Sequence, residues 1–110
     1  MTHDADDVER NSFLFRHLIA MFEALALQQL GKLVNPITGN VERDLRQARI
    51  TIDMLAMIRE KTAGNCEQDE KRLLDAVVTE LQMNYIDETK RADAGAPDPG
   101  SEQSDPERSN

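Results

Sequence analysis

Few side chains in this chain of 110 residues have the types and the spacing that chemistry requires. His17 stands between Arg16 and Leu18 in a helical pattern, with no second histidine or cysteine within a helical turn. A metal site needs several such ligands, and a nucleophile needs an adjacent base. We therefore expect His17 to be a surface or interface residue.

Two other groups could in principle bind a metal ion or react. His3 precedes three aspartates, but an acidic chain end lacks the fixed geometry that makes a cation site selective. Cys66 follows a turn at the start of a helical segment, where the helix dipole favours a thiolate, but Glu67 and the acidic residues after it oppose ionisation. We predict no metal, no cofactor and no catalytic residue.

Carboxylates and a short glycine-containing loop also fail as catalytic features. Three carboxylates fall on the polar side of the last helical segment, with no cleft to desolvate them: Glu70, Asp75 and Glu80. The segment NPITGN, residues 35–40, has one glycine and no lysine, unlike a loop that holds phosphate. It is typical of a turn that starts at Asn35, because Pro36 cannot continue a helix and Gly39 permits a positive φ.

A short basic run suggests one alternative function. Arg43, Arg46 and Arg49 could contact nucleic acid or an acidic partner. Against this, the formal net charge is −8 with a pI near 4.7, which repels phosphate, and no aromatic residues interleave with the arginines for base stacking. Arg49 also stands four residues before Asp53 and can pair with it. Nucleic acid is therefore the runner-up among partners.

Three helical segments must position these residues. The breakers Pro36, Gly39 and Gly64 divide the apolar part of the chain, and the periodicity predicts helices over 12–33, 41–62 and 66–88, with no strand. Asn40 is expected to cap the second helix, and Gly64 to end it in the left-handed conformation. Asn65 with Gln68 resembles a capping box for the third helix. The predicted fold is all-α, a helical hairpin with an outer third helix.

The two chain ends are poor in apolar residues. Residues 1–11 and 89–110 bury too little to offset the entropy of ordering, so we expect acidic disordered tails around one domain over 12–88. The acidic start is unlike a secretory signal, and no apolar run reaches the length of a membrane span. We expect a cytoplasmic protein.

Two of the predicted helices are more apolar than a three-helix monomer needs. The first helix has a broad apolar face, and the second is apolar around most of its circumference. Such excess usually marks a partner site, so we predict a homo-oligomer, with a two-fold dimer favoured. The candidate interface residues lie on these helices: Phe15, Phe22, Ile50, Met54, Met57 and Ile58.

About half of the chain, from Asn35 to Tyr85, resembles a bacterial family known as domain of unknown function 1844. The resemblance is carried by short motifs and single residues along this stretch: NPITGN at 35–40, Asp44, Leu45, Ala48, Arg49, Ile52, Asp53, Leu55, KTAGN at 61–65, Glu70, Leu74 and LQMNY at 81–85. It implies a small helical protein and no activity or cofactor. The chain departs from the family pattern at Cys66, Glu67 and Gln68, where a Leu and a Thr-Pro helix start are usual.

The sequence thus favours a non-enzymatic interaction or scaffold protein that acts through self-association or a protein partner. The alternative is a nucleic-acid accessory protein that uses the basic start of the second helix.

Overall fold

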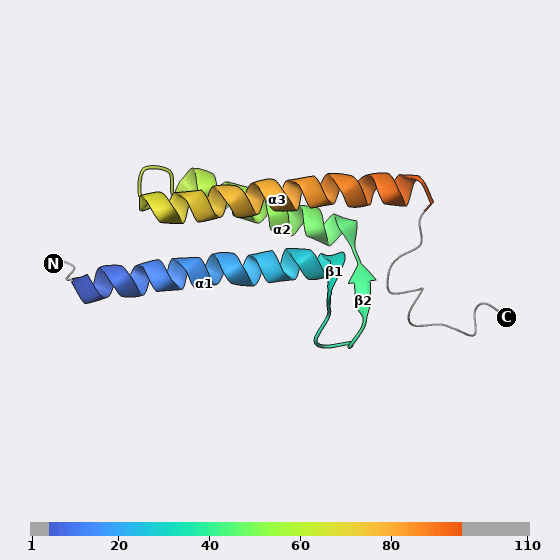
Figure 1. Ribbon diagram of the computed structural model, residues 1–110, viewed down its shortest axis with the longest axis horizontal. Helices are drawn as coiled ribbons and strands as arrows, with labels where there is room; N and C mark the ends of the chain where they lie inside the picture. Colours follow the sequence, from blue (N-terminus) through green and yellow to red (C-terminus); the bar gives the residue numbers. More distant parts are fainter. Residues whose placement is uncertain (1–4, 96–110) are drawn as a thin grey trace.

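The computed structural model describes residues 5–95, which form three helices and a two-stranded sheet. The elements in chain order are α1 (Ala5–Gln29), β1 (Leu30–Val34), β2 (Val41–Arg43), α2 (Leu45–Lys61) and α3 (Gln68–Asp93). Figure 1 shows α1 and α3 side by side, α2 behind α3, and the two strands as a hairpin that projects past α1 at one end. The three predicted helices are confirmed, and the strands are an addition.

One core lies between the three helices. Each helix contributes one apolar stripe at helical spacing, and β1 adds Leu30: Ile19, Ala26, Ala48, Ile52, Leu55, Leu74, Val77, Val78 and Leu81 are buried. α3 buries this single stripe and keeps most of its other sides polar, as its sequence predicted for an outer helix. The core leaves the remaining sides of α1 and α2 to solvent.

The prediction of no strand was wrong for the segment between α1 and α2. Gly31 has a φ of +79°, which ends the helix after Gln29, and the chain continues as an antiparallel pair with Leu30 opposite Arg43 and Val34 opposite Val41. Leu30 and Leu33 fit a helical period, but Leu30 is buried equally well as the first residue of β1. The spacing of apolar residues therefore could not distinguish a helix from a strand over residues 30–33.

The predicted turn over residues 35–40 is confirmed as the tip of this hairpin. Asn35 N donates to Asn40 O and Gly39 N donates to Asn35 O, both at 2.8 Å. The Asn35 side chain accepts from Ile37 N at 2.9 Å, and Gly39 has the expected positive φ of +75°. These bonds hold the tip in one shape.

The caps of α2 and α3 differ from the predicted ones. Because the hairpin occupies residues 30–43, α2 begins only at Leu45, and Asp44 rather than Asn40 caps it by accepting from Gln47 N at 3.1 Å. In α3 the capping box joins Glu67 and Glu70 instead of Asn65 and Gln68. The positive end of the helix dipole also stabilises the carboxylate at each of these caps.

The helical part of the chain extends beyond the predicted domain at both ends. α1 begins at Ala5, so residues 5–11 are helical and not a disordered tail. Asp6 and Asp7 stand in its first turn, where negative charge stabilises a helix. α3 continues to Asp93, with Lys90 and Arg91 in its last turn. The rest of the predicted tails, residues 1–4 and 96–110, lies outside the described residues.

Substitution of Gly64 by valine should destabilise the protein by about 1–2 kcal/mol, because Gly64 has a φ of +86° in the turn between α2 and α3. No atom would contact an added Cβ, so the cost is backbone strain. Urea unfolding measures it. Gly95→Val is the matched control: its φ is +82°, but no described element follows it, and fraying of the helix end can relieve the strain. Equal losses for both variants would contradict the prediction.

Candidate interaction surface

An uncharged apolar stripe runs along the exposed side of α1. Leu14, Leu18, Met21 and Leu25 stand four, three and four residues apart, which is the spacing of a helix that packs against another helix. All four are exposed, Met21 by 59%. We call these four residues the leucine stripe. Leu18 and Leu25 directly precede the buried residues Ile19 and Ala26, so the leucine stripe lies about 100° around α1 from its buried side.

A second apolar group lies on the exposed side of α2. Ile50 and Met57 are exposed, and Met54, one helical turn from each, is half-buried. These three residues are the methionine stripe. Neither stripe contains a charged residue, although 31% of the whole chain is charged.

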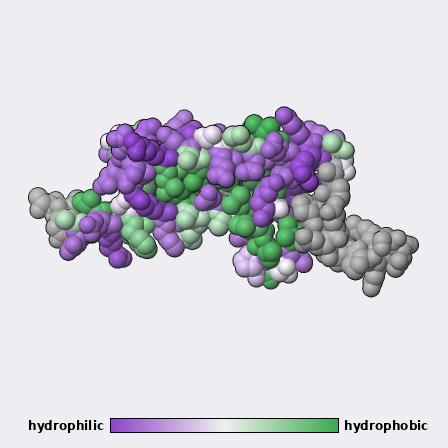
Figure 2. Space-filling view, in the orientation of Figure 1, coloured by the Kyte–Doolittle hydropathy of each residue, from purple (hydrophilic) through white to green (hydrophobic). Residues whose placement is uncertain are grey.

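Both stripes lie on the side of the molecule that is turned away from α3. Arg16 of α1 pairs with Asp69 of α3, and Arg59 of α2 approaches Asp75 of α3 at 4.0 Å, which identifies the α3 side of each helix. On a helical wheel the leucine stripe and Met54 lie on the other flank of their helices. We call this surface the α1–α2 face. Figure 2 shows the side that carries α3, which is largely hydrophilic over that helix.

The predicted interface residues divide between this face and the core. Ile50 and Met57 are exposed on it, and Met54 lies at its edge. Phe15, Phe22 and Ile58 are half-buried and pack against the core. The leucine stripe was missing from the predicted set, although its heptad spacing was visible in the sequence.

A buried carboxylate joins the hairpin to α3. Glu88 is 3% exposed at its side chain, and it accepts from Lys32 Nζ at 2.9 Å and from Arg43 Nη1 at 3.0 Å. Arg91 Nε lies 3.6 Å from the same carboxylate. Burial alone would raise the pKa of Glu88, but the two hydrogen bonds and the positive charges outweigh it and hold that pKa below the ordinary 4.5. Glu88 is therefore ionised at neutral pH.

The basic run predicted for nucleic acid is not one surface. Arg43 is only 8% exposed at its side chain because it faces Glu88, and it belongs to β2 rather than to a helix. Arg49 Nε lies 3.8 Å from Asp53, as the spacing predicted. The sequence missed the role of Arg43 because Glu88 is 45 residues away along the chain.

Residues 12–87 match the sequence profile of a family described as a domain of unknown function, DUF1844. The chain belongs to this family. No curated protein and no solved structure is significantly similar to the chain. The match covers the whole core and both apolar stripes of this DUF1844 domain, and it ends one residue before Glu88.

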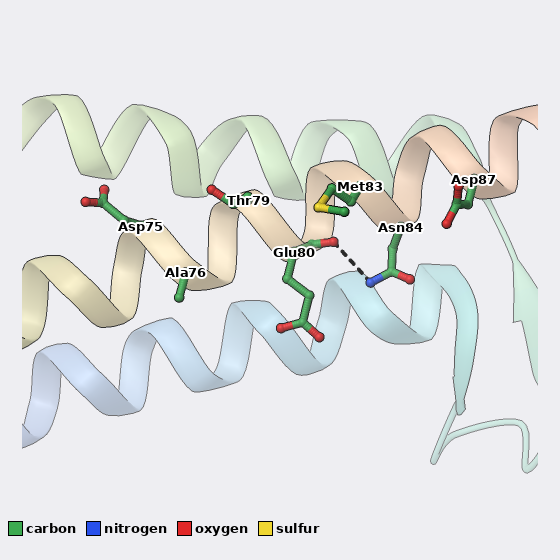
Figure 3. Close-up of a pocket in the computed structure, with 7 residues that line it drawn as sticks. All are labelled: Asp75, Ala76, Thr79, Glu80, Met83, Asn84 and Asp87. Carbon is green, nitrogen blue, oxygen red and sulfur yellow. Dashed lines mark hydrogen bonds between the residues drawn. The ribbon is translucent and has the colours of Figure 1, made fainter.

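One hollow on the other side of the DUF1844 domain is an open surface of a single helix. Its volume is about 510 Å³, and all its lining residues belong to α3: Asp75, Ala76, Thr79, Glu80, Met83, Asn84 and Asp87. Figure 3 shows Glu80 directed toward α1 and Asp75 on the opposite side of α3. Since their carboxylates do not converge, they form no acid and base pair here.

The remaining candidates for chemistry have structural roles or solvent contact. Glu70 is buried, unlike the solvated residue that was expected, because its carboxylate accepts from Glu67 N at 2.8 Å in the capping box. Cys66 is half-buried and donates to Thr62 Oγ1 at 3.3 Å. His17 is exposed and its ring stacks on Phe13 at 6.0 Å. Within residues 5–95 no three acidic, histidine or cysteine side chains are placed to hold a metal ion.

Within residues 5–95, no helix is both long enough and apolar enough to cross a bilayer.

Removal of the buried Glu88 carboxylate should destabilise the fold. Glu88→Ala removes a buried carboxylate that accepts hydrogen bonds from both Lys32 and Arg43, and we expect it to lower the free energy of unfolding by about 3–5 kcal/mol in urea titrations. Asp53→Ala removes one member of the exposed pair with Arg49 and should cost less than about 1 kcal/mol. Similar losses in the two variants would mean that Glu88 does not anchor the hairpin.

The same carboxylate should make stability depend on pH in the acidic range. Because the pKa of Glu88 is lowered on folding, its contribution is complete above the ordinary value of 4.5 and is lost as the pH falls through the lower folded value. Urea midpoints measured between pH 6 and pH 3 should therefore fall more steeply for the wild type than for Glu88→Gln. Parallel curves would contradict the assignment.

Proposed function

We propose that this DUF1844 protein is a non-enzymatic assembly module that forms a homodimer through the α1–α2 face. The observation that carries the proposal is the presence of two apolar stripes, six of whose seven residues are exposed and none of which is charged, on one side of the domain. Large apolar patches on soluble domains usually mark protein interfaces. A second copy is the occupant that requires no additional component, because a two-fold axis makes one patch complementary to itself.

The energetics support such a dimer. Burying the exposed half of a Leu or Met side chain contributes about 1 kcal/mol, and the two stripes bring seven side chains from each copy. Their total is about 14 kcal/mol, whereas the entropic cost of association is roughly 4–15 kcal/mol. If that cost is about 6 kcal/mol, the surplus of about 8 kcal/mol corresponds to a Kd of about 1 μM, and on this basis we expect a dimer at micromolar concentration.

Two other roles are less well supported. Nucleic-acid binding would need the three arginines on one exposed surface, but Arg43 is buried against Glu88. Catalysis would need convergent polar groups, and the carboxylates of α3 diverge (Figure 3). The proposal also places the protein in the cytoplasm, where the free thiol of Cys66 stays reduced.

Sedimentation equilibrium tests the dimer. The wild type should be dimeric at micromolar concentration, and Met21→Glu or Met57→Glu should weaken association by about 100-fold, since the two-fold axis places two charges in each interface. Met83→Glu is the matched control, because Met83 is 62% exposed on α3, close to the 59% of Met21, but lies outside the α1–α2 face.

A wild type that stays monomeric at about 100 μM, a concentration at which even an affinity of about −6 kcal/mol gives dimers, would refute self-association. If Met83→Glu weakened association as much as Met21→Glu, the interface would have to include α3.

A further inference from the structure

We propose that the dimer interface continues from the leucine stripe onto the outward side of α1, so that Phe13 and His17 of each copy are covered by the partner. This inference rests on the proposed dimer and extends its surface. A specific interface of standard size involves about 20–30 residues on each partner, whereas the two stripes supply seven. A dimer of that size therefore also needs residues that lie next to the stripes.

The outward sides of α1 and α2 differ in charge. On a helical wheel at about 100° per residue, the side of α1 between the leucine stripe and α3 carries four residues that we call the outward sector: Phe13, His17, Ala20 and Ala24. The corresponding side of α2, next to the methionine stripe, carries four charged residues: Arg46, Arg49, Asp53 and Glu60. An interface that grows beyond the stripes can therefore extend over α1 without burying a charge, but not over α2.

The charged residues in the middle of α1 lie on its α3 side. Between Asn11 and Gln29 they are Arg16, which pairs with Asp69 of α3, and Glu23, about two helical turns further along. Over the length of the leucine stripe, the outward sector therefore contains no side chain that is charged when histidine is neutral. An identical uncharged surface matches this sector better than a charged partner does.

An exposed aromatic pair is the main feature of the outward sector. The chain has three phenylalanines, of which Phe15 and Phe22 pack against the core, whereas Phe13 is 64% exposed. The Phe13 ring stacks on the exposed ring of His17, with the ring centroids 6.0 Å apart and an angle of 16° between the planes. Aromatic side chains are enriched at protein interfaces, since they bury a large area at a low cost in conformational entropy. The pair thus offers a contact that a partner helix can cover.

Burial of His17 makes the dimer sensitive to pH. The residues one helical turn from His17 are all uncharged, and within residues 5–95 no charged side chain of α2, α3 or the hairpin pairs with its ring: Phe13, Leu14, Ala20 and Met21 are these neighbours. A histidine in water takes up a proton as the pH falls through about 6.5, and a charged imidazole in an uncharged contact lacks a partner. The dimer should therefore dissociate more readily in mild acid. The fold itself should not respond there, because Glu88 stays ionised above pH 4.5.

Sedimentation equilibrium at about pH 7.5 and about pH 5.5 tests the extended interface. Each imidazole that must stay neutral in the dimer weakens association by up to about 10-fold over this range, so with one from each copy the Kd of the wild type should rise by about 10- to 100-fold. His17→Gln is neutral at both pH values, and its Kd should stay nearly constant. His3 is present in both proteins, so its titration cancels in the comparison. The loss of negative charge on acidification acts in the opposite direction, because it reduces repulsion between the copies.

Truncation of Phe13 tests the same surface at neutral pH. Phe13→Ala should weaken association by at least about 10-fold, because each copy loses the contact of a large apolar side chain. Ile86→Ala is the matched control, since Ile86 is 52% exposed on α3 and lies outside the α1–α2 face, so its Kd should equal that of the wild type.

Three results would overturn the extension while the proposed dimer stands. They are a Kd of the wild type that is the same at both pH values, an equal rise in Kd for the wild type and His17→Gln, and a Kd that Phe13→Ala leaves unchanged. A wild type that is monomeric at neutral pH would refute the proposed function as well. Weakening in acid that His17→Gln abolishes, together with weakening by Phe13→Ala and not by Ile86→Ala, supports the extended interface.

Discussion

α1 carries two apolar stripes but can pack only one of them against α2 and α3. The stripe that contains Ile19 and Ala26 enters the core, and the leucine stripe, one residue out of phase, remains in water. α2 also leaves apolar side chains, Ile50 and Met57, exposed to solvent, but fewer of them than α1 does. This constraint accounts for the arrangement of the molecule, in which α3 closes one side of the helix pair with a polar outer surface and the other side stays apolar.

Buried charges reinforce the hairpin end of the fold, where β1 adds Leu30 to the apolar core and the rest of the hairpin is exposed or half-buried. Leu81 is the last fully buried apolar residue of α3, and beyond it α3 is held by Glu88, which binds one residue from each strand of the hairpin. Asp44 and Gln29 connect the same end of α2 to α1 through their backbones. Hydrogen bonds and charges thus hold the hairpin where apolar burial is small.

Much of the fold was predictable because it depends on local patterns. Periodicity gave three helices, and Pro36, Gly39 and Gly64 marked the turns, since the glycines there adopt positive φ. The hairpin was missed because Leu30 can be buried in a helix or in a strand, and because the predicted helix over 12–33 included Gly31, whose positive φ ends α1. The pairing of Arg43 with Glu88 was not predictable, because only the tertiary fold brings these residues together. The choice of interface residues failed in part for a similar reason: a shift of one residue around α1 decides whether Phe22 or Met21 faces the core.

The position of Glu88 bears on where this domain ends. The family match stops at residue 87, and within the described residues 5–95 every buried apolar residue lies before that point. A fragment cut there would retain its whole hydrophobic core and still lack the only carboxylate that Lys32 and Arg43 are seen to share in residues 5–95. We therefore expect a stable fragment to include at least the helical turn after the family boundary, because Glu88 in that turn neutralises the charges of Lys32 and Arg43.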